Sequence, residues 1–275
     1  MVNDTDSQQQ EEGPLQKAAS DGMKEEVQGL LEKGADINSI NGHFGTALNN
    51  AAGGGHLALV RLLLANGADI NLIGGSYCNA LQTAAVCNKA SAVRYLIAAG
   101  ADVNIQGGGF GTALQGACVG GHIDIVHMLL DHGADVNTSP VGYFGSALQA
   151  AADGGHQSTV NLLLKHGADI HAQGGIYGTA LSAAADAGEE EIVTMLLDMG
   201  ADPNVVGGFY GTALQGACRG GHLAVVRRLL DSCATVNSGG GKFGSPMEAA
   251  VQEGHQEVQA LLRARSTPAE RTSAE

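Results

Sequence analysis

The sequence has no tryptophan, and aromatic residues occupy only 4% of its 275 positions. A hydrophobic core must therefore be built mostly from Ala, Val, Ile and Leu. The hydrophobic content of 44% is nevertheless ordinary for a globular chain and argues against global disorder. Basic residues are also scarce, because 14 Lys and Arg stand against 28 Asp and Glu, for a net charge of −14. Nucleic-acid phosphates would be repelled, so we expect no direct nucleic-acid binding.

Cysteine is sparse as well, and no C-x-x-C pair occurs. The odd count argues against a disulfide framework and against a zinc ribbon, and it suits a reducing compartment. No apolar run approaches the roughly 18 residues of a membrane span. The polar N-terminus lacks the basic and apolar regions of a signal peptide. We therefore expect a cytoplasmic or nuclear protein with no membrane attachment. The five cysteines are Cys78, Cys87, Cys118, Cys218 and Cys233.

Glycine, in contrast, is abundant, with 42 residues, and many glycines belong to a repeat. A Gly-Ala-Asp triplet recurs every 33 residues, with one step of 34, and ends in a degraded copy at Cys233. A second marker, Gly-Thr-Ala-Leu or a close variant, keeps the same spacing. A period of about 33 residues predicts a solenoid of stacked units. The triplets begin at Gly34, Gly67, Gly100, Gly133, Gly167 and Gly200.

Each unit has the signals of two short antiparallel helices. In the second copy, Thr46 is placed to cap a first helix that runs from Ala47 to about Gly53. Gly55 begins a turn, and a second helix with an apolar stripe follows it up to Gly67. Only a small side chain lets first helices pack closely, and one position is alanine in every copy. These alanines are Ala18, Ala51, Ala84, Ala117, Ala151, Ala184, Ala217 and Ala250.

The combined run Gly-Thr-Ala-Leu-Gln, Ala-Ala, Gly-His, Val-x-x-Leu-Leu and Gly-Ala-Asp-x-Asn resembles the ankyrin repeat. The resemblance implies an all-α ankyrin-repeat solenoid of helix-turn-helix units with β-hairpin fingers. It also implies binding to other proteins through the fingers and the concave face of the first helices, with no shared catalytic residues. We expect a disordered acidic N-terminus at 1–13, an array of about eight repeats at 14–264, and a flexible tail at 265–275.

Departures from the usual ankyrin pattern are informative. Thr-Ala-Leu-Gln replaces Thr-Pro-Leu-His in the middle copies, and an aromatic residue precedes the Gly-Thr pair. This Gly-Gly-x-aromatic-Gly-Thr-Ala-Leu-Gln dialect is similar to ankyrin arrays of filamentous fungi. The similarity implies a stand-alone array, or a fragment of a longer protein, in a fungal cell or a biosynthetic gene cluster.

The repeated aromatic position is the first candidate for partner binding. A row of rings along the fingers offers anchors to a protein partner. Alternatively, each ring packs on the next finger and holds the row in register, and the strict repetition favours this second interpretation. The seven residues are Phe44, Tyr77, Phe110, Phe144, Tyr177, Tyr210 and Phe243.

Positions that vary between copies are a better guide to a binding surface. One slot on the expected exposed part of the first helix carries Asp153, Asp186 and Arg219 in three successive copies. Such a face suits a mixed, partly basic peptide or domain. The finger tips vary too, and we expect four apolar tip residues to be exposed without a packing partner, which indicates contact with a partner. Neutral variation is the alternative. The four are Ile40, Val141, Val205 and Val206.

Metal and catalytic sites are not indicated. Repetition of histidine in the Gly-His turn predicts a structural hydrogen bond, and His132 and His166 are too far apart for one zinc ion. Cys118 and Cys218 are expected to be small buried side chains. Gly239-x-Gly241-x-x-Gly244 matches a dinucleotide fingerprint only in letters, because no βαβ unit surrounds it. We assign no catalytic residue, no metal and no cofactor.

Two functions remain open from the sequence. The first is a non-enzymatic, monomeric adaptor for another protein, with a regulatory role in transcription or signalling. The second is an atypical enzyme or small-molecule-binding protein that uses the concave face, where a row of glutamines with Asp153 and Asp186 would line a pocket. Convergence of polar side chains at one place would favour the second function, and even spacing along the groove would favour the first.

Overall fold

The computed structural model of the chain describes residues 12–138 and 140–266. Two compact units are distinguished, residues 1–117 with 124–134 (unit 1) and residues 118–123 with 135–275 (unit 2). Most of the expected segment 1–13 and of the expected tail 265–275 therefore lies outside the described residues. Arg265, assigned to the tail, is instead the last residue of a helix.

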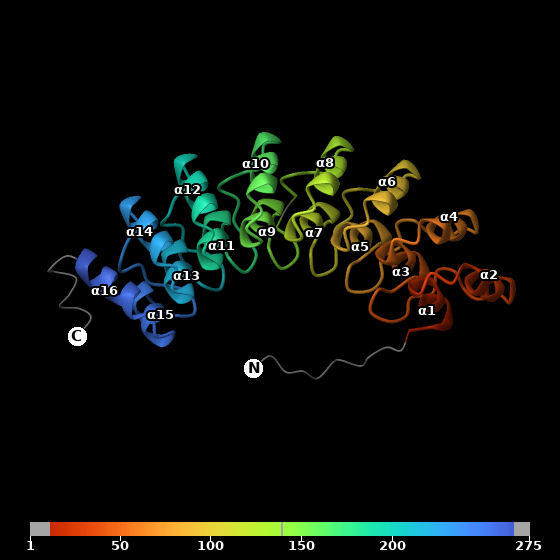
Figure 1. Cartoon of the computed structure of the whole chain (residues 1–275), viewed down its shortest axis with the longest axis horizontal. Helices are drawn as coiled ribbons and strands as arrows, with labels where there is room; N and C mark the ends of the chain where they lie inside the picture. The colour runs from red at the N-terminus through yellow and green to blue at the C-terminus, as the bar shows by residue number, and fades with distance from the viewer. Residues whose placement is uncertain (1–11, 139, 267–275) are drawn as a thin grey trace. The chain divides into compact units, whose positions relative to one another are not determined.

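Unit 1 consists of short helices in pairs. The first helices α1, α3 and α5 lie side by side, and α4 packs beside α6 in a second row (Figure 1). The helices of unit 1 are α1 (Pro14–Ser20), α2 (Lys24–Glu32), α3 (Ala47–Gly54), α4 (Leu57–Ala65), α5 (Ala80–Val86) and α6 (Ala90–Ala98), and α7 (Ala113–Val119) and α8 (Ile123–Asp131) extend across the division between the units.

Unit 2 repeats this arrangement. Helices α9, α11, α13 and α15 form its first row, and α10, α12, α14 and α16 form its second row. The bounds are α9 (Ala147–Asp153), α10 (Gln157–Lys165), α11 (Ala180–Ala187), α12 (Glu190–Asp198), α13 (Ala213–Gly220), α14 (Leu223–Asp231), α15 (Pro246–Gln252) and α16 (Gln256–Arg265). The prediction of an all-α solenoid of helix-turn-helix units is confirmed.

Local signals in the sequence set the helix ends. Thr46 caps α3, because its Oγ1 accepts a hydrogen bond of 3.1 Å from the backbone N–H of Asn49. Gly67, after α4, has a φ of +89°, a left-handed conformation that glycine adopts without steric cost. The repeated alanine is at most 2% exposed in all eight copies, which lets adjacent first helices pack closely.

The fingers are narrow turns instead of extended hairpins. In the described residues six of the fingers are each closed by one isolated antiparallel bridge, such as Gly207 with Gly211, where the Gly207 N–H donates to the Gly211 carbonyl at 3.0 Å. Successive fingers are also joined through their backbones in unit 2. The N–H of Phe209 donates to the Ile176 carbonyl at 2.6 Å, and the N–H of Lys242 donates to the Phe209 carbonyl at 2.9 Å. The fingers of this unit therefore form a hydrogen-bonded row.

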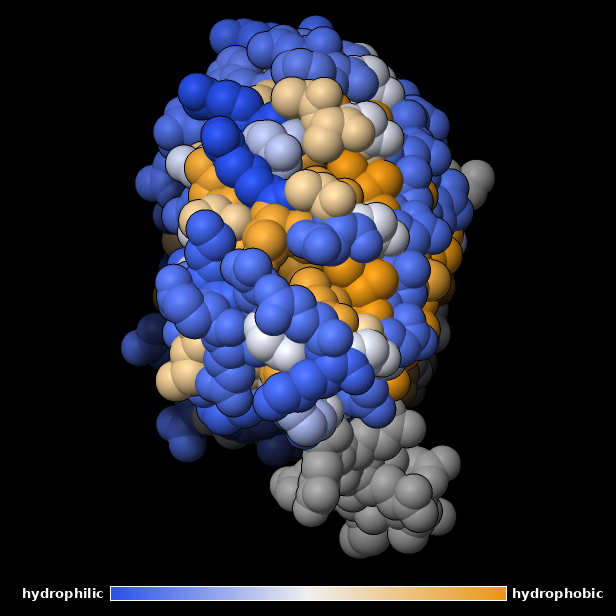
Figure 2. All heavy atoms as spheres, turned by 90° about the vertical axis from the view of Figure 1, so that its right-hand side faces the viewer, coloured by the Kyte–Doolittle hydropathy of each residue, from blue (hydrophilic) through white to orange (hydrophobic). Residues whose placement is uncertain are grey.

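Figure 2 faces the end of unit 1 that carries α1 and α2, and it shows a central apolar area bordered by polar side chains. Of the nine residues of α2, only Val27 is buried. Met23, just before α2, is 49% exposed.

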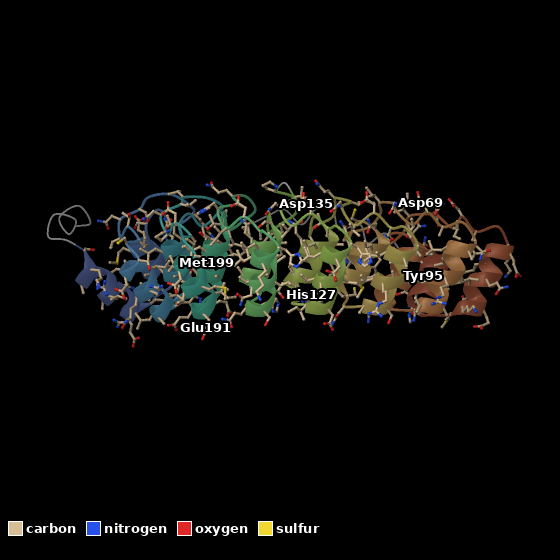
Figure 3. The ribbon with its side chains drawn as sticks, turned by 90° about the horizontal axis from the view of Figure 1, so that it is seen from above. Asp69, Tyr95, His127, Asp135, Glu191 and Met199 are labelled. Carbon is tan, nitrogen blue, oxygen red and sulfur yellow. The ribbon has the colours of Figure 1, made fainter. Side chains whose placement is uncertain are left out.

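In Figure 3, Asp69 of unit 1 lies among the loops and Tyr95 lies on the layer of second helices. The loop surface and the second-helix surface of this unit are therefore separate.

Candidate interaction surface

The repeated aromatic rings form a packed row within each unit. In unit 1 the ring centroids of Phe44 and Tyr77 are 5.4 Å apart, and those of Tyr77 and Phe110 are 5.6 Å apart. These separations are typical of favourable ring pairs. In unit 2 the corresponding separations are 6.4 Å for Phe144–Tyr177, 6.0 Å for Tyr177–Tyr210 and 6.3 Å for Tyr210–Phe243. The ring-to-ring packing predicted as the alternative to binding is therefore present.

The four apolar tip residues differ in exposure. Ile40 is 47% exposed and Val206 is 54% exposed, whereas Val141 and Val205 are mostly buried. Ile40 and Val206 also each have a neighbour in the next finger. A Cβ added at Gly74 would lie 3.1 Å from Ile40 Cγ1, and one at Gly240 would lie 3.0 Å from Val206 Cγ1. The expectation that these tips lack a packing partner is wrong for Ile40 and Val206, because a glycine backbone runs directly beneath each.

The variable slot of the first helices holds a paired charge in unit 2. The Nε of Arg219 donates to Oδ1 of Asp186 at 2.7 Å, and its Nη2 donates to Oδ2 at 2.5 Å. The guanidinium carbon of Arg219 also lies 4.8 Å from the centroid of the Tyr210 ring. Asp186 is only 7% exposed, so the expectation that its slot faces solvent is wrong at this position. Arg219 covers the carboxylate and shields it from water.

The same slot one copy earlier holds Asp153, which is half-buried. Burial raises the pKa of its carboxyl, a side-chain hydrogen bond with Tyr177 lowers it, and the charge of Asp186 raises it further. Burial also raises the pKa of the Tyr177 hydroxyl, and the hydrogen bond with Asp153 adds to that rise. The charges of Asp153 and Asp186 also raise the pKa of Tyr143, after the larger effect of burial.

These side chains form one group, which we name the acidic–aromatic cluster. It combines two carboxylates with one guanidinium, so its fixed charges sum to −1. Desolvated carboxylates beside aromatic rings favour cations. The cluster consists of Tyr143, Asp153, Tyr177, Asp186, Tyr210 and Arg219.

Two exposed aromatic residues of unit 2 were not among the sequence candidates. Tyr143 is 52% exposed and Phe209 is 50% exposed, and each packs edge-on against the repeated ring that follows it. Their position varies from copy to copy, with residues as different as glycine, histidine and lysine. Applying the test of variation between copies to this position as well would have found both.

The row of glutamines does not line an open pocket. Gln82, Gln149 and Gln215 are buried, and each amide nitrogen donates to carbonyl oxygens of the next finger. The Gln215 Nε2, for example, donates to the carbonyls of Gly240 at 2.7 Å and Gly244 at 3.1 Å. These amides are used to attach fingers to first helices. The alternative in which the glutamine row lines a pocket is therefore not supported for these residues.

The histidines of the turns have the structural role that their repetition predicts. The Nε2 atoms of His156 and His222 lie 3.0 Å from the carbonyl oxygens of Val119 and Asp186, respectively. Each carbonyl belongs to the residue at the variable position of the first helix in the preceding copy. In the described part of the chain, no group of three or more His, Cys, Asp or Glu side chains is arranged to hold a metal ion.

The two cysteines expected in the core are fully buried. Cys118 and Cys218 both have 0% exposure. Burial raises the pKa of the Cys218 thiol to about 12 and that of Cys118 still higher. Both thiols are therefore protonated at neutral pH and are poor nucleophiles.

Comparison with known proteins agrees with this architecture. A family model described as ankyrin repeats (3 copies) matches residues 2–74, 72–140, 142–207 and 181–270. The chain therefore belongs to the ankyrin repeat family, whose repeats mediate protein–protein interactions and are typically non-enzymatic. No curated protein matches the sequence. No helix of the described ranges has both the length and the apolar character needed to cross a membrane.

Proposed function

We propose that this chain is a non-enzymatic adaptor of about eight ankyrin repeats, and that it binds another protein through unit 2. The binding surface combines the acidic–aromatic cluster with the exposed finger residues Tyr143, Val206 and Phe209. Given the fungal-type dialect of the repeats, we assign it a regulatory role in transcription or signalling, as a monomer in the cytoplasm or nucleus of a fungal cell.

One observation carries this proposal. Tyr143, Val206 and Phe209 are 52%, 54% and 50% exposed, and all three lie on the fingers of the unit that contains the Arg219–Asp186 ion pair. Exposed apolar side chains gathered near desolvated charges are typical of protein-binding surfaces. The buried glutamine amides, which bond to the fingers, weigh against a small-molecule pocket at the same place.

Affinity capture from the native cell, followed by mass spectrometry, tests the proposal. The variant Tyr143→Ser/Val206→Ser/Phe209→Ser removes the exposed apolar side chains of the fingers. The control Met23→Ser/Met199→Ser removes two similarly exposed side chains outside the fingers. We expect the wild type and the control to capture the same protein and the finger variant to lose it. Equal capture by a finger variant of unchanged thermal stability would contradict the proposal.

A further inference from the structure

Two slot carboxylates of unit 2 occupy equivalent positions, and only one of them has a cation. Asp186 is followed 33 residues later by Arg219, which binds both of its oxygens. Asp153 is followed 33 residues later by Asp186, so the place of the arginine is taken by a second acid. Among the described side chains, no lysine or arginine forms an ion pair with Asp153.

The aromatic ring beside each carboxylate is also repeated. Tyr210 lies beneath the guanidinium of Arg219, with 4.8 Å between the guanidinium carbon and the ring centroid. Tyr177 stands one copy earlier, 33 residues before Tyr210, and its hydroxyl interacts with the carboxyl group of Asp153. The carboxylate and the ring that hold a guanidinium in one repeat are therefore both present in the preceding repeat.

We propose that an arginine side chain of a partner protein binds between Asp153 and Tyr177, in the arrangement that Arg219 adopts between Asp186 and Tyr210. The exposed ring of Tyr143 flanks this position. The inference rests on the proposed function, because it assigns the chemistry of the partner at the same surface.

Charge and geometry both favour arginine. The acidic–aromatic cluster has a net charge of −1 from Asp153, Asp186 and Arg219, and the whole chain has −14, so a basic segment is attracted. A guanidinium is planar, pairs with a carboxylate through two parallel hydrogen bonds, and stacks on an aromatic face. A lysine ammonium provides a point charge without the two-pronged fit, and it is more costly to desolvate.

Nuclear magnetic resonance of the full chain, labelled with nitrogen-15, provides the test. The probe is the peptide acetyl-Gly-Ser-Arg-Ser-Gly-amide, with matched peptides that carry lysine or neutral citrulline, and with free arginine. We expect saturable shifts of amides around Asp153 and Tyr177 with the arginine peptide. The lysine peptide should bind at least about fivefold more weakly, and citrulline should not bind. Equal shifts with citrulline, or tighter binding of free arginine than of the peptide, would overturn the proposal.

Variants give results in opposite directions. Asp153→Asn should weaken binding of the arginine peptide about tenfold. Arg219→Gln uncovers Asp186 and Tyr210 and should add a second set of shifts around those residues. Asp198→Asn, which alters an exposed ion pair between α12 and α14, serves as the control and should leave binding unchanged.

Unchanged affinity in a folded Asp153→Asn variant would overturn the arginine assignment. The same variant separates this assignment from the proposed function. If Asp153→Asn still captures the partner from cells and the peptide does not bind, the adaptor proposal stands and the arginine assignment fails. If the wild type captures no protein but the peptide binds at Asp153, the adaptor proposal fails and the arginine site stands.

Discussion

Arg219 and Asp186, 33 residues apart in the chain, are joined by two parallel hydrogen bonds of 2.7 and 2.5 Å. The side chain of Asp186 is 6% exposed and that of Arg219 is 30% exposed, so most of the desolvation falls on the acid. Hydrogen bonding to Asp186 raises the pKa of Arg219, although burial opposes the rise. The pair therefore connects α11 to α13 and fixes one edge of the acidic–aromatic cluster.

Removing the arginine should destabilise the protein, because a nearly buried carboxylate then loses its partner. We expect Arg219→Gln to lower the free energy of unfolding by about 1–3 kcal/mol. Arg228→Gln is the matched control, since its partner Asp198 is 64% exposed, and it should cost less than about 1 kcal/mol. Urea unfolding followed by circular dichroism measures both. Equal losses for the two variants would show that burial of Asp186 contributes nothing.

A second prediction concerns the contribution of the buried Gln215 amide to stability. It donates to two carbonyls of the next finger and accepts from the N–H of Thr212 at 2.7 Å. Gln215→Ala leaves these backbone groups without their partner and should cost about 2–3 kcal/mol. Gln252→Ala, at an exposed position of α15, should be nearly neutral. A neutral Gln215→Ala would mean that water replaces the amide, and the glutamine row would again be open to a ligand-binding role.

The repeated alanine makes a third prediction about packing between first helices. Ala184 is 0% exposed on α11, which packs against both α9 and α13. Ala184→Leu should lower the free energy of unfolding by about 2–3 kcal/mol, because the added carbons have no space. Ala224→Leu, at an exposed position of α14, is the control. Unchanged thermal stability of Ala184→Leu would contradict the close packing of α9, α11 and α13.

The degraded Gly-Ala-Asp copy at Cys233 leads to two predictions with opposite effects on stability. Cys233 is exposed and has a φ of +64°, at the position where Gly200 has a φ of +93°. Cys233→Gly should stabilise the protein by about 1 kcal/mol, because a side chain is strained in this conformation. Gly200→Ala should destabilise it by a similar amount, although a Cβ there meets no neighbouring atom. Thermal melts of both variants measure the two effects, and changes of the same sign would contradict this explanation.

The raised pKa of Asp153 predicts how binding depends on pH. The folded protein binds a proton at Asp153 more readily than a free aspartate does. A cation requires the ionised form, so affinity for the arginine peptide should fall as the pH falls through this pKa. The loss should begin above the usual aspartate value of about 3.9. Peptide titrations between pH 7 and pH 4 measure the dependence, and Asp153→Asn should abolish it.

Much of the fold could be predicted from the sequence because its signals are local and repeated. Thr46 caps a helix by a hydrogen bond with Asn49, three residues further along the chain. The position of Ala184 is alanine in every copy, where adjacent first helices pack together. The packing of Ile40 against the next finger and the burial of Asp186 could not be predicted in this way. The first depends on the backbone path of Gly74 in the next finger, and the second on the side chain of Arg219 in the next repeat.

The acidic–aromatic cluster could be predicted from the sequence only in part, for the same reason. Its charged members are identifiable as varying positions, but a list of positions does not show that Arg219 pairs with Asp186 and leaves Asp153 without a cation. The exposed ring of Tyr143 was not predicted, because its position varies between copies and lies directly before the strictly repeated aromatic position.

Photo-cross-linking in the native cell tests the central claim most directly. In one variant the photoreactive benzoylphenylalanine replaces Tyr143, on a finger of unit 2. In the other it replaces the exposed Glu191 on α12, which is labelled in Figure 3. The adaptor account predicts one discrete protein adduct from position 143 and none from position 191. The arginine assignment predicts, in addition, loss of the adduct when Asp153→Asn is added. Absence of an adduct at position 143, or equal adducts from both positions, would contradict it.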